Sequence, residues 1–157
     1  YKRSKLLASD KATGDEFTYD FIKSIRPDTC IMLNPVCPLI DYTDIRNSVS
    51  AYQNSSCDTL ISCETTQMQA FCADQWINID VNKKLQPSQK NPTISILNWG
   101  ITIWNAKSFL SKYERTGSAY LGKDRLLFPL KQENCLKIST ESDFKLAEIM
   151  IKGKGAQ

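Results

Sequence analysis

The stretch from Thr29 to Asp41 constrains the fold of this chain more than any other. It reads Thr-Cys-Ile-Met-Leu-Asn-Pro-Val-Cys-Pro-Leu-Ile-Asp. The first five residues suit a buried strand, and the two prolines that follow can neither continue a helix nor pair inside a sheet. In an open α/β sheet, ligands bind beyond the carboxyl ends of the strands, so residues 34–38 are where we first expect a ligand. The alternative is a strand followed by a proline-stiffened loop that binds nothing.

Helices and strands alternate on both sides of this stretch. Thr13 and Glu16 have the spacing of a capping box, which predicts a helix that ends at Arg26-Pro27. A second helix, capped by Asp41 or Thr43, leads to another short buried strand at residues 58–63. This alternation is typical of βαβ units, so we expect an α/β fold with a mostly parallel sheet flanked by helices.

The pattern changes over residues 64–104, which we expect to form an excursion rich in β-structure. Residues 64–82 suggest short strands paired through a turn at Ala73-Asp74-Gln75, and residues 82–92 form a long polar loop. The β-like run from Thr93 to Trp104 is interrupted by Asn98 and Gly100, which suggests a bulge or a close approach to a ligand. A helix from Asn105, short strands at residues 125–130 and 135–138, and a final helix follow. The length of 157 residues suits a single domain.

Composition excludes several kinds of chemistry. The chain has no histidine, which excludes histidine-based catalytic triads. Its 20 basic and 17 acidic residues give a net charge of +3, too balanced to imply a nucleic-acid or membrane partner, although an anionic ligand would be tolerated. The six cysteines form no Cys-x-x-Cys pair, so we expect free thiols. The chain contains no signal peptide and no apolar run near 18 residues, which favours a cytoplasmic protein.

Four segments, taken in order, resemble the acylneuraminate cytidylyltransferases, which activate sialic acid and related acidic sugars with CTP. Residues 3–12 are similar to the family's Arg-Pro-x-x-Leu-Ala-x-Asp-x-Ala, and residues 34–39 to its Gln-Pro-Thr-Ser-Pro-Leu. Residues 89–98 are similar to its Gln-Asp-Leu-Pro with Asn-Gly nine residues after the Gln, and residues 137–148 to its Asp-Ile-Asp-Thr-Glu-x-Asp-Phe-x-x-Ala-Glu. The resemblance implies a Rossmann-like sheet, a homodimer built through residues 64–104, and transfer of CMP from CTP to a sugar hydroxyl.

The chain departs from that family at two places. The family's glycine-rich Arg-x-Gly-Ser-Lys-Gly loop, which binds the triphosphate, would lie before Tyr1, so we expect the domain to be incomplete at its amino end. The family is expected to use Mg²⁺, but Lys137 and Ser139 replace the two aspartates of its metal site. A lysine repels Mg²⁺, so no metal ligand is assigned here, and we expect the 157-residue chain to be inactive by itself.

The resemblance also implies two groups of site residues, while catalytic residues stay unassigned. The nucleotide side would comprise Arg3, Ala12 and Gly14, and the sugar side Asn34, Gln89 and Asn98. The alternatives are that Arg3 is merely solvated and that the asparagines cap turns or strand ends. Lys137 is interpreted as a solvated residue, with a charge that faces an anionic ligand as its alternative. A competing function is a non-catalytic sugar-nucleotide-binding or dimerisation module, and a third is a transferase for another sugar acid or alcohol.

Overall fold

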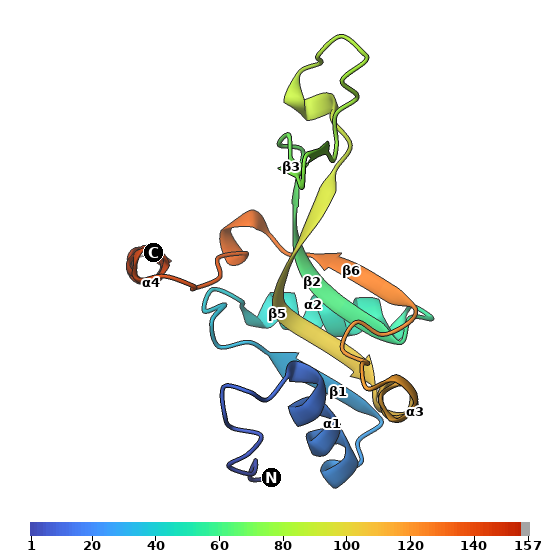
Figure 1. Ribbon diagram of the computed structural model, residues 1–157. Coiled ribbons are helices and arrows are strands. Elements are labelled where there is room, and N and C mark those ends of the chain that lie inside the picture. Colours follow the sequence, from blue (N-terminus) through green and yellow to red (C-terminus); the bar gives the residue numbers. More distant parts are fainter. Residues whose placement is uncertain (155–157) are drawn as a thin grey trace.

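A four-stranded sheet forms the centre of the computed structural model, which describes residues 1–154 (Figure 1). Its strands lie in the order β1-β5-β2-β6. Their bounds are β1 Thr29–Leu33, β5 Ile94–Asn105, β2 Thr59–Thr66 and β6 Arg125–Pro129. Strands β1, β2 and β6 run in one direction, and β5 runs opposite to them between β1 and β2. The expected α/β fold with a mostly parallel sheet is therefore confirmed.

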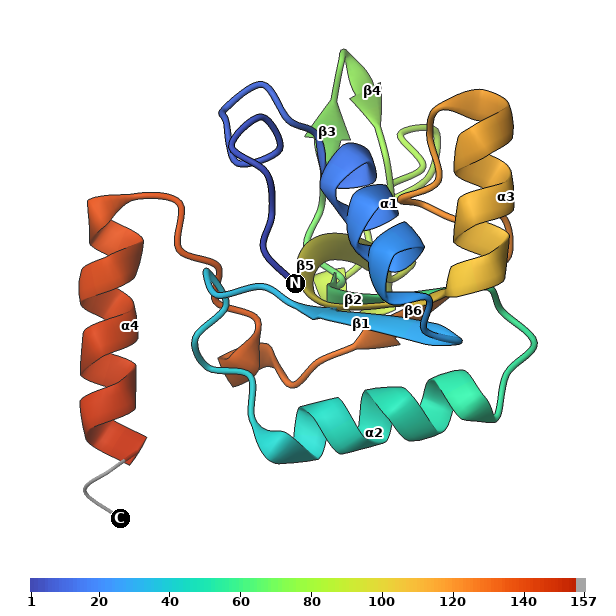
Figure 2. The same ribbon diagram turned by 90° about the horizontal axis from the view of Figure 1, so that it is seen from below.

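Helices cover both faces of this sheet. Helices α1 (Gly14–Ile25) and α3 (Ala106–Thr116) lie on one face, and α2 (Tyr42–Gln53) lies on the other (Figure 2). Under α1 and α3, Ile22 packs with the buried Trp104 and Phe109. On the α2 side, the core is formed by Leu60, Ile101, Ile103, Leu130 and Cys135.

The predicted helix caps are present. The Glu16 amide donates to Thr13 Oγ1 at 3.3 Å and the Thr13 amide donates to Glu16 Oε2 at 2.7 Å, which completes the capping box of α1. The bond from the Thr13 amide, together with a bond that the Thr13 hydroxyl donates to Glu16 Oε2 at 2.9 Å, lowers the pKa of the Glu16 carboxyl. Arg26 ends the helix in the left-handed conformation, with φ 57°. Of the two caps considered for α2, Asp41 is the one used, in a reciprocal pair with Asp44.

A bulge divides β2 and β5 into two halves. The register between them shifts between Ile61 and Cys63. At this point Asn98 Oδ1 accepts from Ser62 Oγ at 2.6 Å and from the Gly100 amide at 3.1 Å. Ser62 Oγ in turn accepts from the Ile101 amide at 2.9 Å. The polar interruption of the β-like run therefore forms the predicted bulge.

Beyond the bulge, residues 64–97 form an arm that projects from the sheet (Figure 1). It contains the short pair β3 (Phe71–Cys72) and β4 (Gln75–Trp76), joined by the predicted turn, and the 3-10 helix η1 (Ser88–Lys90). Asn78 is 3% exposed, and its side chain joins segments of the arm by hydrogen bonds. Its Oδ1 accepts from the Ala70 amide at 2.9 Å, and its Nδ2 donates to the carbonyl oxygens of Met68 and Pro92.

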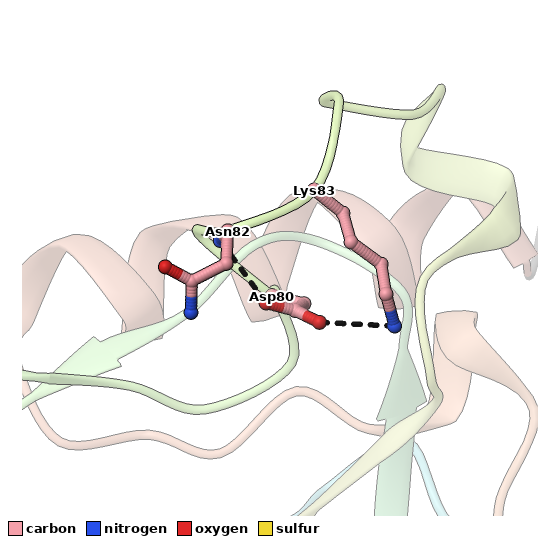
Figure 3. A network of polar contacts seen from close by, with 3 residues as sticks. All are labelled: Asp80, Asn82 and Lys83. Atoms are coloured by element: carbon pink, nitrogen blue, oxygen red, sulfur yellow. Dashed lines mark hydrogen bonds and ion pairs between the residues drawn. The ribbon is translucent and has the colours of Figure 1, made fainter.

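The outer loop of the arm is ordered by one carboxylate (Figure 3). Asp80 Oδ1 accepts from the Asn82 amide at 3.0 Å, and Asp80 Oδ2 pairs with Lys83 Nζ at 3.0 Å. The bond from Lys83 and that from Asn82 hold the pKa of the Asp80 carboxyl below its usual value.

The end of the chain differs from expectation in one element. Residues 135–138 were predicted as a strand, but they follow the 3-10 helix η2 (Gln132–Asn134) as irregular chain. The Ile138 amide pairs with the Val36 carbonyl of the turn after β1, so this segment closes a loop instead of extending the sheet. Helix α4 (Glu141–Lys154) stands apart from the helices that cover the sheet (Figure 2).

All six cysteines are free, as predicted. Within residues 1–154, no helix combines the length and apolar character that crossing a membrane would need.

Candidate functional site

A cavity of about 460 Å³ lies beyond the carboxyl end of β1. Segments from five parts of the chain line it: the start of α1, the turn after β1, the bulge of β5, the loop after α3 and the loop after η2. The lining residues are Gly14, Asp15, Asn34, Trp99, Ser118, Tyr120, Leu121 and Lys137. This is the place at which an open α/β sheet binds its ligands.

The turn after β1 builds one wall. The Asn34 amide pairs with the Gly100 carbonyl at 2.9 Å, and Asn34 Oδ1 accepts from the Val36 amide at 3.3 Å. Asn34 therefore caps its own turn through Oδ1, which leaves its Nδ2 group as the donor that could reach a ligand. The bond from Ile138 to the same turn brings the neighbouring Lys137 to the cavity.

Two aromatic side chains build the opposite wall. The rings of Trp99 and Tyr120 lie 5.2 Å apart between centroids, and Trp104 packs on Tyr120 from the protein interior at 4.9 Å. Trp104 Nε1 also donates to the Tyr120 carbonyl at 2.8 Å. Burial, with a smaller contribution from Asp15, raises the pKa of Tyr120 to about 12. The phenol is therefore neutral at neutral pH, and the wall can stack on a flat ligand.

Trp99 holds an unusual backbone conformation. Its φ of 59° lies in the left-handed region, which a bulky residue adopts only at a cost. The neighbouring Asn98 and Ser62 fix the bulge that imposes this conformation. Because of the bulge, the indole lines the cavity while the adjacent Asn98 stays buried behind it.

The start of α1 closes the cavity at its third side. A Cβ atom on Gly14 would lie 2.9 Å from the Tyr120 ring, so glycine permits the close approach of helix and ring. Asp15 Oδ1 accepts from the Ala119 amide and from the Tyr120 amide, the latter at 2.8 Å. This carboxylate therefore fixes the aromatic wall.

Electrostatically, the cavity holds one carboxylate and one ammonium group, those of Asp15 and Lys137. Lys137 lies close enough to the buried Cys37 to oppose the increase in thiol pKa that burial causes. Mg²⁺ prefers several hard oxygen ligands, and one Asp15 oxygen already accepts from two amides. Within residues 1–154 no cluster of three or more metal-ligating side chains occurs.

The sequence-derived site residues are only partly brought together. Gly14 and Asn34 both line the cavity, although they were assigned to opposite sides of the ligand. Arg3 lies over the Phe17 ring at 5.3 Å and lines a different hollow. Ala12 precedes the cap of α1, and Gln89 lies in η1 on the arm.

Asn98 is the most buried of these residues, at 6% exposed, and its Nδ2 has no hydrogen-bond partner among the described residues. Lys137 is exposed, as expected for a solvated residue, and it also lines the cavity. Asp15, Trp99 and Tyr120 were missed. For Trp99 a signal existed, since it lies between the two residues that marked the interruption of β5.

The comparisons with known proteins support the fold. No protein-family model matches the chain, and no curated protein matches it in sequence. Among solved structures, the chain is similar to the crystal structure of 4-diphosphocytidyl-2C-methyl-D-erythritolsynthase from Anaerococcus prevotii DSM 20548. The TM-score is 0.62 at 11% sequence identity, and the match covers 90% of this chain and 68% of that chain. At this identity the likeness shows the fold, which is that of the Anaerococcus protein.

Proposed function

We propose that this chain carries the site of a cytidylyltransferase that transfers CMP from CTP to a hydroxyl of an acidic sugar, such as a sialic acid or a related nonulosonate. The observation that carries the proposal is the cavity beyond β1, where Asn34, Lys137 and the aromatic wall converge. The motifs that resemble acylneuraminate cytidylyltransferases support it. The fold likeness adds a neighbour that is named as a 4-diphosphocytidyl-2C-methyl-D-erythritolsynthase.

The chemistry proposed for the cavity follows from its side chains. Trp99 and Tyr120 offer a face on which a pyrimidine ring can stack. Lys137 supplies a positive charge for the phosphates or the sugar carboxylate, and Asn34 Nδ2 supplies a donor for a sugar hydroxyl. In-line attack of a hydroxyl on the α-phosphorus then requires positioning and charge neutralisation, and no histidine is needed.

A second candidate is favoured by the charges of the cavity. Lys137 and Ser139 replace carboxylates, and Asp15 is committed to backbone amides. A site of this kind could bind a sugar nucleotide without turning it over. This non-catalytic module binds the same ligand as the enzyme, and only an assay of CMP transfer distinguishes the two.

One experiment separates these functions. CTP binding is measured by calorimetry for the 157-residue chain, and CMP transfer to N-acetylneuraminate is assayed for the natural gene product. We expect CTP to bind, and Lys137→Gln to weaken binding by about tenfold because a charge-assisted contact is lost. Lys145→Gln, which removes a charge from the exposed face of α4, is the matched control. Transfer supports the enzyme, and binding without transfer supports the module. Absence of CTP binding would contradict both.

We also propose that the arm mediates a homodimer. Its exposed apolar side chains include Phe71, Trp76, Ile77 and Leu85. No other segment of the described residues covers them. Large exposed apolar groups rimmed by polar ones mark interaction surfaces. Analytical ultracentrifugation should find a dimer that Ile77→Glu converts to monomer, whereas Asn82→Glu on the same arm should not. A wild-type monomer at all accessible concentrations would contradict this proposal.

A further inference from the structure

A second concave surface lies at the opposite end of the sheet from the candidate cavity. It is a hollow of about 550 Å³ between α3 and the start of β6. Five basic side chains line it, and we call it the basic hollow: Lys107, Lys112, Arg115, Lys123 and Arg125. A smaller hollow of about 340 Å³ shares Lys107 and adds Lys23 and Arg26. The positive charges therefore continue from α3 to the end of α1.

Most of these charges are not neutralised within the protein. Lys112 Nζ donates to the Gly122 carbonyl. Within residues 1–154, none of the other four basic side chains of the hollow forms an ion pair. The one carboxylate in the lining is Asp58, and it accepts from Thr59 Oγ1 at 2.9 Å and from the Lys123 amide at 3.1 Å. That carboxylate is engaged in holding the loop.

The loop that carries Lys123 is built to a fixed position. Gly122 has φ +63°, and a Cβ atom there would lie 2.0 Å from Thr59 Oγ1 and 2.4 Å from Asp58 Oδ1. Only glycine lets the loop pack so closely on the start of β2. Gly122 therefore lets the Lys123 amide donate to the Asp58 carboxylate, and the chain then enters β6 at Arg125.

The arrangement of the charges indicates the class of ligand. Lys107 and Arg115 lie on one side of α3, eight residues or about 12 Å apart by helical rise. Charges spread over this length suit several linked phosphates better than one. Among the described residues no aromatic side chain lines the basic hollow, so these residues offer no stacking surface for a base. The hydroxyls of Ser108 and Ser111 add neutral donors to the lining.

We propose that the basic hollow binds an oligophosphate, either an inorganic polyphosphate chain or the phosphate chain of a nucleotide. Recognition is through charge-assisted bonds from lysine and arginine to linked phosphates. The basic hollow shares no lining residue with the candidate cavity, and the proposal does not depend on the cytidylyltransferase proposal.

The test is calorimetric titration of the full chain with sodium tripolyphosphate and with orthophosphate, at constant ionic strength. We expect tripolyphosphate to bind at least about tenfold more tightly than orthophosphate, because linked phosphates contact several cations at once. Arg115→Gln combined with Arg125→Gln should weaken tripolyphosphate binding by about tenfold or more. Lys145→Gln combined with Lys152→Gln removes the same charge from α4, where each lysine faces a glutamate, and should change affinity by less than about twofold.

Three outcomes of these phosphate titrations overturn the proposal: no preference over orthophosphate, an equal loss in the α4 control, or a loss with Lys137→Gln but not with the arginine variant. The last would place the phosphates in the candidate cavity. Titration with long-chain polyphosphate and with ATP then distinguishes the two sources, since the natural ligand should bind more tightly than tripolyphosphate. Tighter binding of a DNA duplex than of either would instead indicate a nucleic-acid surface and overturn the proposal.

Discussion

Strands β2 and β5 form two structures of different character on the two sides of one bulge. In the sheet, both strands are buried, with Leu60, Ile101 and Ile103 inaccessible to solvent. In the arm, the residues of the same strands are half-buried or exposed, and Ile96 is 50% exposed. The sheet half is held by apolar burial between two helical layers, whereas the arm half is held by side-chain bonds to the backbone. Strand pairing therefore determines the direction of β2 and β5 in both halves. The burial of their side chains determines how stable each half is.

The largest expected effect is in the sheet half. Trp104 is 1% exposed and packs on Tyr120 and Phe109. Trp104→Ala should lower the free energy of unfolding by about 3–5 kcal/mol, because it leaves a cavity and frees the Tyr120 carbonyl. Denaturant unfolding measures this effect. Trp76→Ala in the arm is the matched control, and an equal loss there would break the distinction between the halves.

A smaller and local effect is expected in the arm. Asn78→Ala leaves three backbone groups without their partner, which should cost about 1–3 kcal/mol. Hydrogen exchange should show faster exchange at residues 64–97 while the amides of the sheet half stay protected. Asn82→Ala is the control and should leave both regions unchanged, because the Asn82 side chain bonds to no backbone group among the described residues. Faster exchange throughout the sheet would show that arm and sheet unfold together.

At the bulge itself, two contributions should nearly cancel. Trp99→Gly removes the left-handed strain of a bulky residue, worth about 1–2 kcal/mol, but also removes ring contact with Tyr120. The free energy of unfolding should change by less than about 1 kcal/mol, while CTP binding should weaken by about tenfold. A variant that unfolds as easily as Trp104→Ala would show that Trp99 belongs to the core rather than to the site.

The smallest effect concerns pH and the tip of the arm. The pKa of Asp80 is lowered from 3.8 by the bonds from Lys83 and Asn82, so the folded loop favours the carboxylate. The stabilisation is present above pH 3.8 and is lost as pH falls through the lower folded pKa. The amide signals of residues 80–83 should shift over that acid range in the wild type, and Asp80→Asn should abolish the transition. A transition that persists in this variant would assign it to another group.

Local signals predicted much of the fold. The capping box at Thr13 and the strand from Thr29 depend on neighbouring residues, and both are present where expected. The strand expected at residues 135–138 failed because its apolar residues serve the core and the turn after β1 rather than a ladder. The place of β5 between β1 and β2 depends on long-range pairing that no local pattern encodes.

The site was less predictable than the fold. The Asn34 turn was found because prolines mark it, whereas Tyr120 lies in a loop whose sequence carries no such sign. Its place depends on the bond to Asp15, 105 residues away. Asn98 stands out in the sequence as a polar residue within a strand. Its Oδ1 accepts two buried hydrogen bonds that stabilise the bulge, and the bulge places Trp99 at the cavity. The role of Asn98 as a sugar ligand stays a prediction, as do those of Gln89 and Arg3.

The central claim is that the ligand binds beside Trp99 and away from the arm. Titration of the ¹⁵N-labelled chain with CTP, followed through the indole N–H signals of its three tryptophans, tests it most directly. The Trp99 signal should shift with CTP concentration and the Trp76 signal should stay in place. A shift of Trp76 without one of Trp99, or no shift at saturating CTP, would contradict the claim.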